Sequence, residues 1–135
     1  MIKSEVQIRV LYAHTDKMGI MNNGRYFEFF EAGRNSLLRD IGFPYPELEK
    51  SNIGLPVIEA HANYISAALY DDIITVYSYL RQVPTVRIKI DYELYAGNKL
   101  IATGYTIHSF IKLDILKPTR PPKEFVEFVK SRLNV

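Results

Sequence analysis

Residues 23–41 read NGRYFEFFEAGRNSLLRDI, and the apolar members of this stretch recur at spacings of three and four. That spacing predicts a helix of about 27 Å with one apolar face. The residues of this face are Tyr26, Phe29, Phe30, Gly33, Leu37 and Ile41. Gly42 and Pro44 are expected to end the helix. Because a glycine costs about 1 kcal/mol of helix propensity relative to alanine, Gly33 indicates that the helix backbone packs closely against a sheet.

Alternating apolar and polar residues before and after this helix predict β-strands. The predicted strands cover residues 5–12, 57–68, 72–82, 85–95 and 99–112. A Gly97-Asn98 turn joins the last two strands, and a short helix is expected over residues 121–133. Residues 42–56 are predicted as a loop with a helical turn at 47–51. The chain is therefore predicted to be an α+β protein in which a five-stranded antiparallel sheet wraps around the long helix.

The composition fits a single globular domain over residues 1–135, of which 47% are hydrophobic. The absence of cysteine excludes disulfides, zinc–thiolate sites and a Cys nucleophile, and it fits a reducing cytoplasm. No apolar run reaches the ~20 residues that a membrane span requires. The net charge of +2 is too small to indicate a nucleic-acid partner. The basic residues Lys112, Lys117, Arg120 and Lys123 form either a solvated surface or a surface compatible with a phosphate-bearing ligand.

The segment between the first strand and the long helix combines a carboxylate with a helix start. Asn22 or Asn23 is a suitable N-cap, and the helix start offers free backbone N–H groups with partial positive charge. Such groups can hold a carbonyl oxygen that is becoming an oxyanion. Asp16 could activate water or attack the carbonyl carbon directly. A purely structural interpretation also fits these residues, with Asp16 closing a turn and an asparagine capping the helix.

Residues 12–32, YAHTDKMGIMNNGRYFEFFEA, resemble the signature of hot-dog-fold acyl-CoA thioesterases. The resemblance is to the 4-hydroxybenzoyl-CoA thioesterase-like group, which includes the Tol–Pal-associated thioesterases. Further matches are Gly42-Phe43-Pro44-Tyr45, Tyr70-Asp71-Asp72 and Pro122-Lys123-Glu124. With the order and lengths of the predicted strands, the resemblance covers nearly the whole chain and implies the hot-dog fold, with the long helix at its centre.

The resemblance also implies an activity and a site. The expected reaction is hydrolysis of a small or medium acyl-CoA to the free acid and CoA, with no cofactor, since CoA is part of the substrate. Asp16 is the implied general base or nucleophile, and Asn23 is the second implied catalytic residue. Backbone N–H groups near Asn23 and Gly24 would polarise the thioester carbonyl. The predicted substrate-binding residues are Gly19, Gly24, Tyr26 and His61.

Two departures from the family pattern keep alternatives open. His14 stands where the family has the first Asp of an Asp-Thr-Asp motif, and Asn23 stands where many relatives have His. The loss of that His is compatible with a non-catalytic module that binds acyl-CoA. A hot-dog hydratase or dehydratase is disfavoured, because no His follows Asp16 at the spacing of those enzymes.

The remaining histidines and the long second strand give further expectations. His61, between Glu59 and Asn63 on one strand face, could line the pocket opposite Asp16 from a partner subunit, or it could lie on a wet sheet face. His108 is expected to be a hydrogen-bonded sheet histidine. The exposed edge of the second strand predicts pairing between two copies, and the resemblance implies a dimer or homotetramer with the site at the dimer interface.

Overall fold

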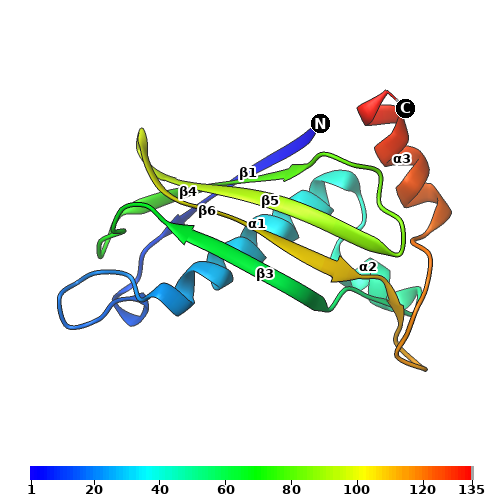
Figure 1. The fold of residues 1–135 in the computed structure, drawn as a ribbon, viewed down its shortest axis with the longest axis horizontal. Helices are drawn as coiled ribbons and strands as arrows, with labels where there is room; N and C mark the ends of the chain where they lie inside the picture. Colours follow the sequence, from blue (N-terminus) through cyan, green and yellow to red (C-terminus); the bar gives the residue numbers. More distant parts are fainter. Residues whose placement is uncertain (135) are drawn as a thin grey trace.

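One long helix lies across a five-stranded antiparallel sheet (Figure 1). The computed structural model describes residues 1–134, and Val135 lies outside the described residues. The strands are β1 (Ile2–Arg9), β3 (Val57–Tyr64), β4 (Ile73–Leu80), β5 (Arg87–Ala96) and β6 (Lys99–Ser109), in the spatial order β1-β4-β5-β6-β3. The long helix is α1 (Tyr26–Ile41), and α3 (Lys123–Leu133) ends the described chain. The predicted α+β architecture is confirmed.

Short elements fill the connections between these strands and helices. Two 3-10 turns, η1 (Tyr12–His14) and η2 (Asn23–Arg25), frame the loop before α1, and α2 (Tyr45–Lys50) follows it. The short strands β2 (Ile53–Gly54), β7 (Ile111–Lys112) and β8 (Lys117–Pro118) form a second, three-stranded sheet. The sequence pattern does not predict this sheet, because a two-residue strand is too short to show a period.

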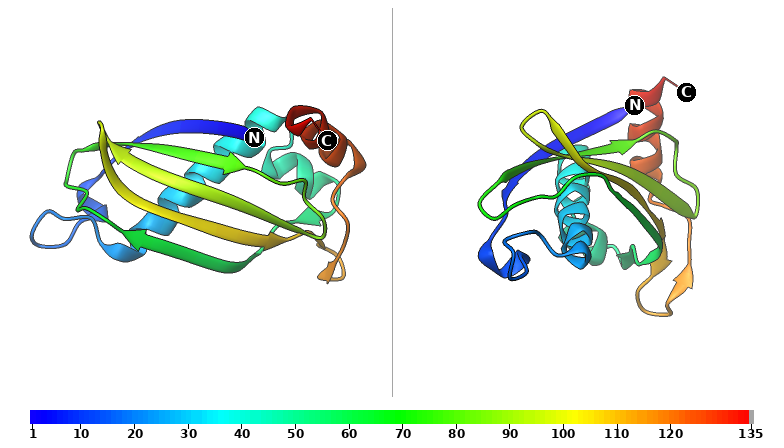
Figure 2. Two further views of the ribbon diagram at one scale, coloured as in Figure 1. Left: turned by 45° about the horizontal axis from the view of Figure 1, so that its top comes forward. Right: turned by 60° about the vertical axis from the view of Figure 1, so that its left-hand side comes forward.

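The predicted apolar face of α1 is buried along its whole length, against the concave side of the curved sheet (Figure 2). At Gly33 a Cβ would lie 2.5 Å from the Ser78 Oγ and 2.6 Å from the Val76 Cγ1, both on β4. The predicted close approach of this glycine to the sheet is therefore confirmed. Gly42 ends the helix in the left-handed conformation, with φ +95.

The first strand ends earlier than predicted. It spans Ile2–Arg9 rather than residues 5–12, and Tyr12 is wound into η1 with its side chain 76% exposed. The turn is stabilised by the Leu11 N–H, which donates to the His14 Nδ1 at 2.9 Å. The predicted end of this strand at residue 12 was wrong because this local side-chain hydrogen bond competes with the strand. β3 likewise ends at Tyr64 rather than at residue 68.

The two edges of the sheet are β1 and β3. Apart from Ala62, every residue of β3 is exposed, and its outer side has no strand partner among residues 1–134. An edge strand of this length is a template for pairing with another strand. Within the described chain, no helix is both long and apolar enough to cross a membrane.

Candidate active site

The loop that carries Asp16 is folded back on itself at the start of α1. The Asn22 N–H donates to the His14 carbonyl oxygen at 2.8 Å, which closes the base of the loop. Gly19 adopts φ +75, and a Cβ there would meet nothing within 4 Å. The glycine is therefore required by the turn and not by a close neighbour.

Asp16 closes this turn with one carboxylate oxygen. Its Oδ1 accepts the backbone N–H groups of Met18 at 2.9 Å and Ile20 at 3.3 Å. Its Oδ2 has no hydrogen-bond partner among residues 1–134, and the residue is exposed. The structural interpretation of Asp16 thus holds for Oδ1, while the free oxygen can accept a proton from water or attack a carbonyl carbon.

The helix start offers one free backbone donor. Asn22 is the N-cap, and its Oδ1 accepts the Gly24 N–H at 3.0 Å. The Gly24 donor, which the sequence predicts to polarise the substrate carbonyl, is therefore occupied. The exposed Asn23 has an N–H with no acceptor in the described part of the chain. Asn23 rather than Gly24 is thus the donor that can hold an oxyanion without first breaking a hydrogen bond.

The end of β3 lies beside this helix start. The Tyr64 hydroxyl donates to the Asn23 carbonyl oxygen at 3.0 Å, and the Tyr64 and Tyr26 rings meet edge to face with centroids 4.9 Å apart. Burial raises the pKa of the Tyr26 hydroxyl. A hollow of about 280 Å³ opens here, lined by Ile20, Met21, Asn23, Tyr26, Tyr64, Ile65, Ser66 and Ala67. Two of the predicted site residues, Asn23 and Tyr26, therefore share one hollow.

His61 lies on the other face of the sheet. Ala60 and Tyr64 face α1, whereas the His61 ring stacks on Tyr105 with centroids 5.4 Å apart. Its Nε2 lies 3.2 Å from the Asn63 Oδ1. The period of two along a strand therefore separates His61 from the residues that face the helix. Within one copy, His61 is a sheet-face histidine, and the expectation that it lines the pocket opposite Asp16 from a partner subunit stays a prediction.

A second hollow, of about 320 Å³, lies along the flank of α1. Its lining residues are Phe27, Glu28, Glu31, Arg34, Val57, Ala60 and Thr106. Arg34 is only 6% exposed, although the helical pattern places it off the apolar face of α1. Its Nη2 lies 3.9 Å from the Oε1 of the exposed Glu31. The burial of Arg34 has to be compensated inside the core, because an unpaired buried charge is costly.

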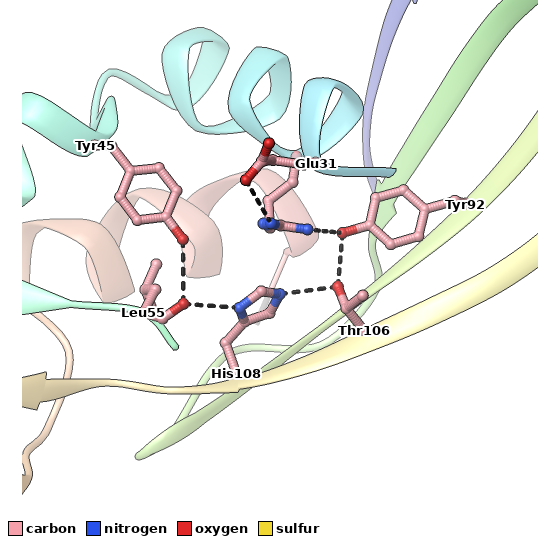
Figure 3. Close-up of polar contacts among 7 residues, drawn as sticks. Glu31, Tyr45, Leu55, Tyr92, Thr106 and His108 are labelled. Carbon is pink, nitrogen blue, oxygen red and sulfur yellow. Dashed lines mark hydrogen bonds and ion pairs between the residues drawn. The ribbon is translucent and has the colours of Figure 1, made fainter. Parts of the chain in front are cut away.

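That compensation is a chain of hydrogen bonds that runs into the sheet (Figure 3). The Arg34 Nη1 donates to the Tyr92 hydroxyl at 3.3 Å, which lies 2.7 Å from the Thr106 Oγ1. Thr106 in turn lies 2.8 Å from the His108 Nε2, and the His108 Nδ1 lies 2.9 Å from the Leu55 carbonyl oxygen. Since a carbonyl only accepts, Nδ1 carries the proton, and a neutral His108 accepts from Thr106 at Nε2.

Burial, assisted by the nearby charge of Arg34, lowers the pKa of His108 to about 4. The neutral state agrees with these hydrogen bonds. A proton on Nε2 would leave the hydroxyl proton of either Tyr92 or Thr106 without an acceptor among these contacts, because Arg34 only donates. The predicted hydrogen-bonded sheet histidine is therefore confirmed.

A larger hollow, of about 710 Å³, lies at the opposite end of the molecule from Asp16, between the β4–β5 connection and α3 (Figure 1). It contains none of the residues predicted to bind or hydrolyse the thioester. Its basic members are Arg120, Lys123 and Lys130, and the first two belong to the basic group that is compatible with a phosphate-bearing ligand. The size of this hollow is therefore not evidence about the chemistry at the start of α1.

The geometry at the start of α1, together with the fold, can be compared with known proteins. The sequence matches the family model of the Thioesterase-like superfamily over residues 10–129. The chain belongs to this family. The acyl-CoA thioesterase YbgC of Haemophilus influenzae is 28% identical to this thioesterase-like protein over 118 residues, which are 87% of each chain.

Two solved structures show the same fold. A DHNA-CoA thioesterase from Staphylococcus aureus is 31% identical, with a TM-score of 0.89 over 99% of this chain and 91% of its own. A 4-hydroxybenzoyl-CoA thioesterase variant in complex with 4-hydroxybenzoyl-CoA has a TM-score of 0.84 over 95% of this chain and 99% of its own. At 18% identity, this second likeness concerns the fold alone.

These matches confirm the hot-dog fold and the resemblance to acyl-CoA thioesterases, and the named relatives support a thioester hydrolase. The roles of Asp16, Asn23, Gly19, Gly24 and Tyr26 stay predictions. Sequence reasoning missed Tyr64, because its contact with Asn23 joins residues that are 41 positions apart. The burial of Arg34 was also missed. The signal that could have indicated it is the neighbouring Gly33, which brings this part of the helix close to the sheet.

Proposed function

We propose that this thioesterase-like protein hydrolyses the thioester of an acyl-CoA to a carboxylic acid and free CoA. The observation that supports the proposal is that two groups in the segment before α1 are free. The Asp16 Oδ2 and the Asn23 N–H are both without a partner among residues 1–134. A base and an oxyanion donor are the two groups that acyl hydrolysis requires.

In the general-base route, Asp16 takes a proton from water while the water oxygen attacks the thioester carbonyl carbon. The Asn23 N–H donates to the resulting oxyanion. The tetrahedral intermediate then expels the CoA sulfur, which recovers the proton from Asp16. In the nucleophilic route, the Asp16 carboxylate forms a mixed anhydride with the acyl group, CoA leaves, and water hydrolyses the anhydride. Neither route involves a metal or redox cofactor.

Substrate binding is proposed at the hollow beside Tyr26 and Tyr64, with Gly19 shaping the loop around Asp16. The unpaired edge of β3 supports a homodimer, which could double into a homotetramer. We infer that the reaction takes place in the cytoplasm, because the absence of cysteine from the sequence fits a reducing compartment.

The test is release of free thiol from a panel of acyl-CoA substrates that ranges from acetyl to medium-chain and aromatic acyl groups. Turnover of at least one member, with the free acid as second product, is the expected result. Acyl-CoA binding by calorimetry without thiol release from any member would replace the proposal with a non-catalytic binding module. The same measurement with the acyl groups attached to acyl-carrier protein shows whether CoA or acyl-carrier protein is the preferred carrier.

A further inference from the structure

The hairpin formed by β7 and β8, residues 111–118, displays three large apolar side chains to solvent. Leu113, Ile115 and Leu116 are 39%, 53% and 71% exposed, and they are called the apolar tip below. Leu116 adopts φ +54, a conformation that is unfavourable for leucine. Clustered apolar exposure of this kind marks a surface that something else covers.

The hairpin is nevertheless held firmly in place. The Asn52 side chain donates to the Asp114 Oδ1 at 2.9 Å and accepts the Asp114 N–H at 3.0 Å. The Leu113 N–H donates to the Asn52 carbonyl oxygen, and the Leu116 N–H donates to the Lys112 carbonyl oxygen at 2.7 Å. The apolar tip thus has a defined conformation, as expected of a preorganised binding surface.

The free edge strand β3 connects this hairpin to the Asp16 site. Its first residue, Val57, follows β2, which pairs with β7 of the hairpin. Its last residue, Tyr64, donates to the Asn23 carbonyl oxygen at the helix start. The hairpin and the Asp16 loop therefore lie at opposite ends of one unpaired strand, and the hairpin reaches beyond the free edge in the views of Figures 1 and 2.

Pairing with a second copy of the chain would bring these two ends together. If two β3 edges pair antiparallel about a two-fold axis, the start of one strand lies beside the end of the other. The hairpin of one copy then lies beside the Asp16 loop of the other. That end of the molecule exposes its own set of large apolar side chains, which are Leu11, Tyr12, Met18, Tyr64, Ile65, Leu69 and Tyr70. In such a dimer the two exposed apolar clusters would face each other.

We propose that the β7–β8 hairpin of one copy closes over the Asp16 site of a second copy, so that its apolar tip walls the acyl-binding hollow in trans. The inference rests on the proposed thioesterase function. Lys112 and Lys117 flank the tip and form no ion pair among residues 1–134, so the hairpin also brings two cations toward the anionic CoA. In a single copy the 280 Å³ hollow is open to solvent, so there is room for such a wall.

The test is subunit complementation. One chain carries Asp16→Asn, and the other carries Ile115→Ser with Leu116→Asn, since asparagine tolerates the left-handed conformation. Each homodimer is expected to lose activity, the hairpin variant by at least about tenfold in kcat/KM. An isolated heterodimer regains about half of the wild-type rate, because its one intact Asp16 lies under the intact hairpin of the other copy.

The reciprocal pairing is the control. In a heterodimer of a wild-type chain with a chain that carries both sets of substitutions, the only intact Asp16 lies under the altered hairpin. This heterodimer is expected to show no more than the residual rate of the hairpin homodimer. Half of the wild-type rate in this pairing, or no recovery in the first, would show that the hairpin acts within its own copy and would overturn the inference. Wild-type activity of the hairpin homodimer, or a wild-type chain that sediments only as a monomer at micromolar concentration, would also overturn it. A wild-type chain that hydrolyses no acyl-CoA would instead refute the proposed function.

Discussion

The Oδ1 of Asn22 accepts the backbone N–H of Gly24 at 3.0 Å, so the cap of the helical segment consumes one of the donors at its start. The neighbouring Asn23 N–H is left without an acceptor in the described residues. Of these two successive backbone N–H groups, that of Gly24 is therefore used by the helix cap, and that of Asn23 is available for an oxyanion. The cap fixes the backbone of the loop, and the free donor is held ready for a substrate.

The first prediction removes this free donor with Asn23→Pro. Proline has no N–H, and it is tolerated in the first turn of a helix. Asn22, the residue before it, already has the extended conformation that a following proline requires, with φ −65 and ψ 138. We therefore expect an unchanged fold and a loss of about 10²–10³ in kcat.

The matched control is Asn23→Ala, which keeps the N–H and removes only the side chain. Because the proposal uses the backbone group, this variant should retain most of the activity. Equal losses in the proline and alanine variants would assign the role to the Asn23 side chain, and no loss in the proline variant would place the oxyanion elsewhere.

The second prediction concerns the seat of α1 on the sheet. Gly33→Ala places a methyl group 2.5 Å from the Ser78 Oγ, so the helix has to move outward. Although alanine is a better helix former by about 1 kcal/mol, we expect the variant to lose about 1–3 kcal/mol of unfolding free energy. Urea denaturation measures this loss. Adding Val76→Ala should make the double variant more stable than the two single losses predict, and strict additivity would contradict the steric explanation.

The third prediction follows from the neutral state of His108. In the folded chain its pKa is about 4, against 6.5 for the free side chain. Between these two values the unfolded chain takes up a proton that the folded chain does not, so stability falls as the pH drops through this window. The full difference corresponds to about 3 kcal/mol. Above pH 6.5 this contribution is complete, and below pH 4 it is lost.

Denaturation at pH 7, 5.5 and 4 checks this prediction against His108→Asn. Asparagine can still donate to the Leu55 carbonyl oxygen but does not titrate. Carboxylates contribute to the pH dependence of both proteins, so the comparison isolates His108. The variant is expected to be less stable at pH 7 and to lose less stability on acidification, and parallel pH profiles would contradict the assignment.

The sequence predicts those features that depend on neighbours along the chain. The apolar face of α1, its end at Gly42 and the alternation along β5 all follow from spacing within one element. The boundary of β1 was missed because the hydrogen bond from the Leu11 N–H to the His14 side chain turns the chain at Tyr12. The periodicity of apolar residues indicates whether a segment prefers a helix or a strand. Local hydrogen bonds between side chains and the backbone decide where that helix or strand ends.

The candidate site shows the same division. Asp16 and Asn23 were singled out by their positions in the stretch that resembles the family signature, and their catalytic roles stay predictions. The assignment of the backbone donors was not available from the sequence. Whether Gly24 or Asn23 keeps a free N–H depends on which asparagine caps the turn, and the sequence allowed either one. The chain of contacts from Arg34 to His108 joins α1 to β5 and β6, so no local pattern predicts it.

The last prediction is Asp16→Asn. An asparagine Oδ1 can still accept the N–H groups of Met18 and Ile20, so the turn should persist and the melting temperature should change little. The amide nitrogen takes the place of the free oxygen, which removes both the base and the nucleophile. If Asp16 activates water, kcat should fall by about 10²–10⁴, and nucleophilic attack would make the loss at least as large.

Asp72→Asn is the matched control for this substitution. Asp72 also closes a turn, since its Oδ2 accepts the Leu69 N–H at 2.9 Å, but it has no part in the proposed chemistry. Its variant should keep most of the wild-type kcat. Each tenfold loss is about 1.4 kcal/mol of barrier, so even the low end of the expected range for Asp16→Asn is easily resolved. An Asp16→Asn protein that melts like the parent and retains more than about a third of kcat, far above the general-base range, would remove Asp16 from the mechanism and leave it as a turn residue.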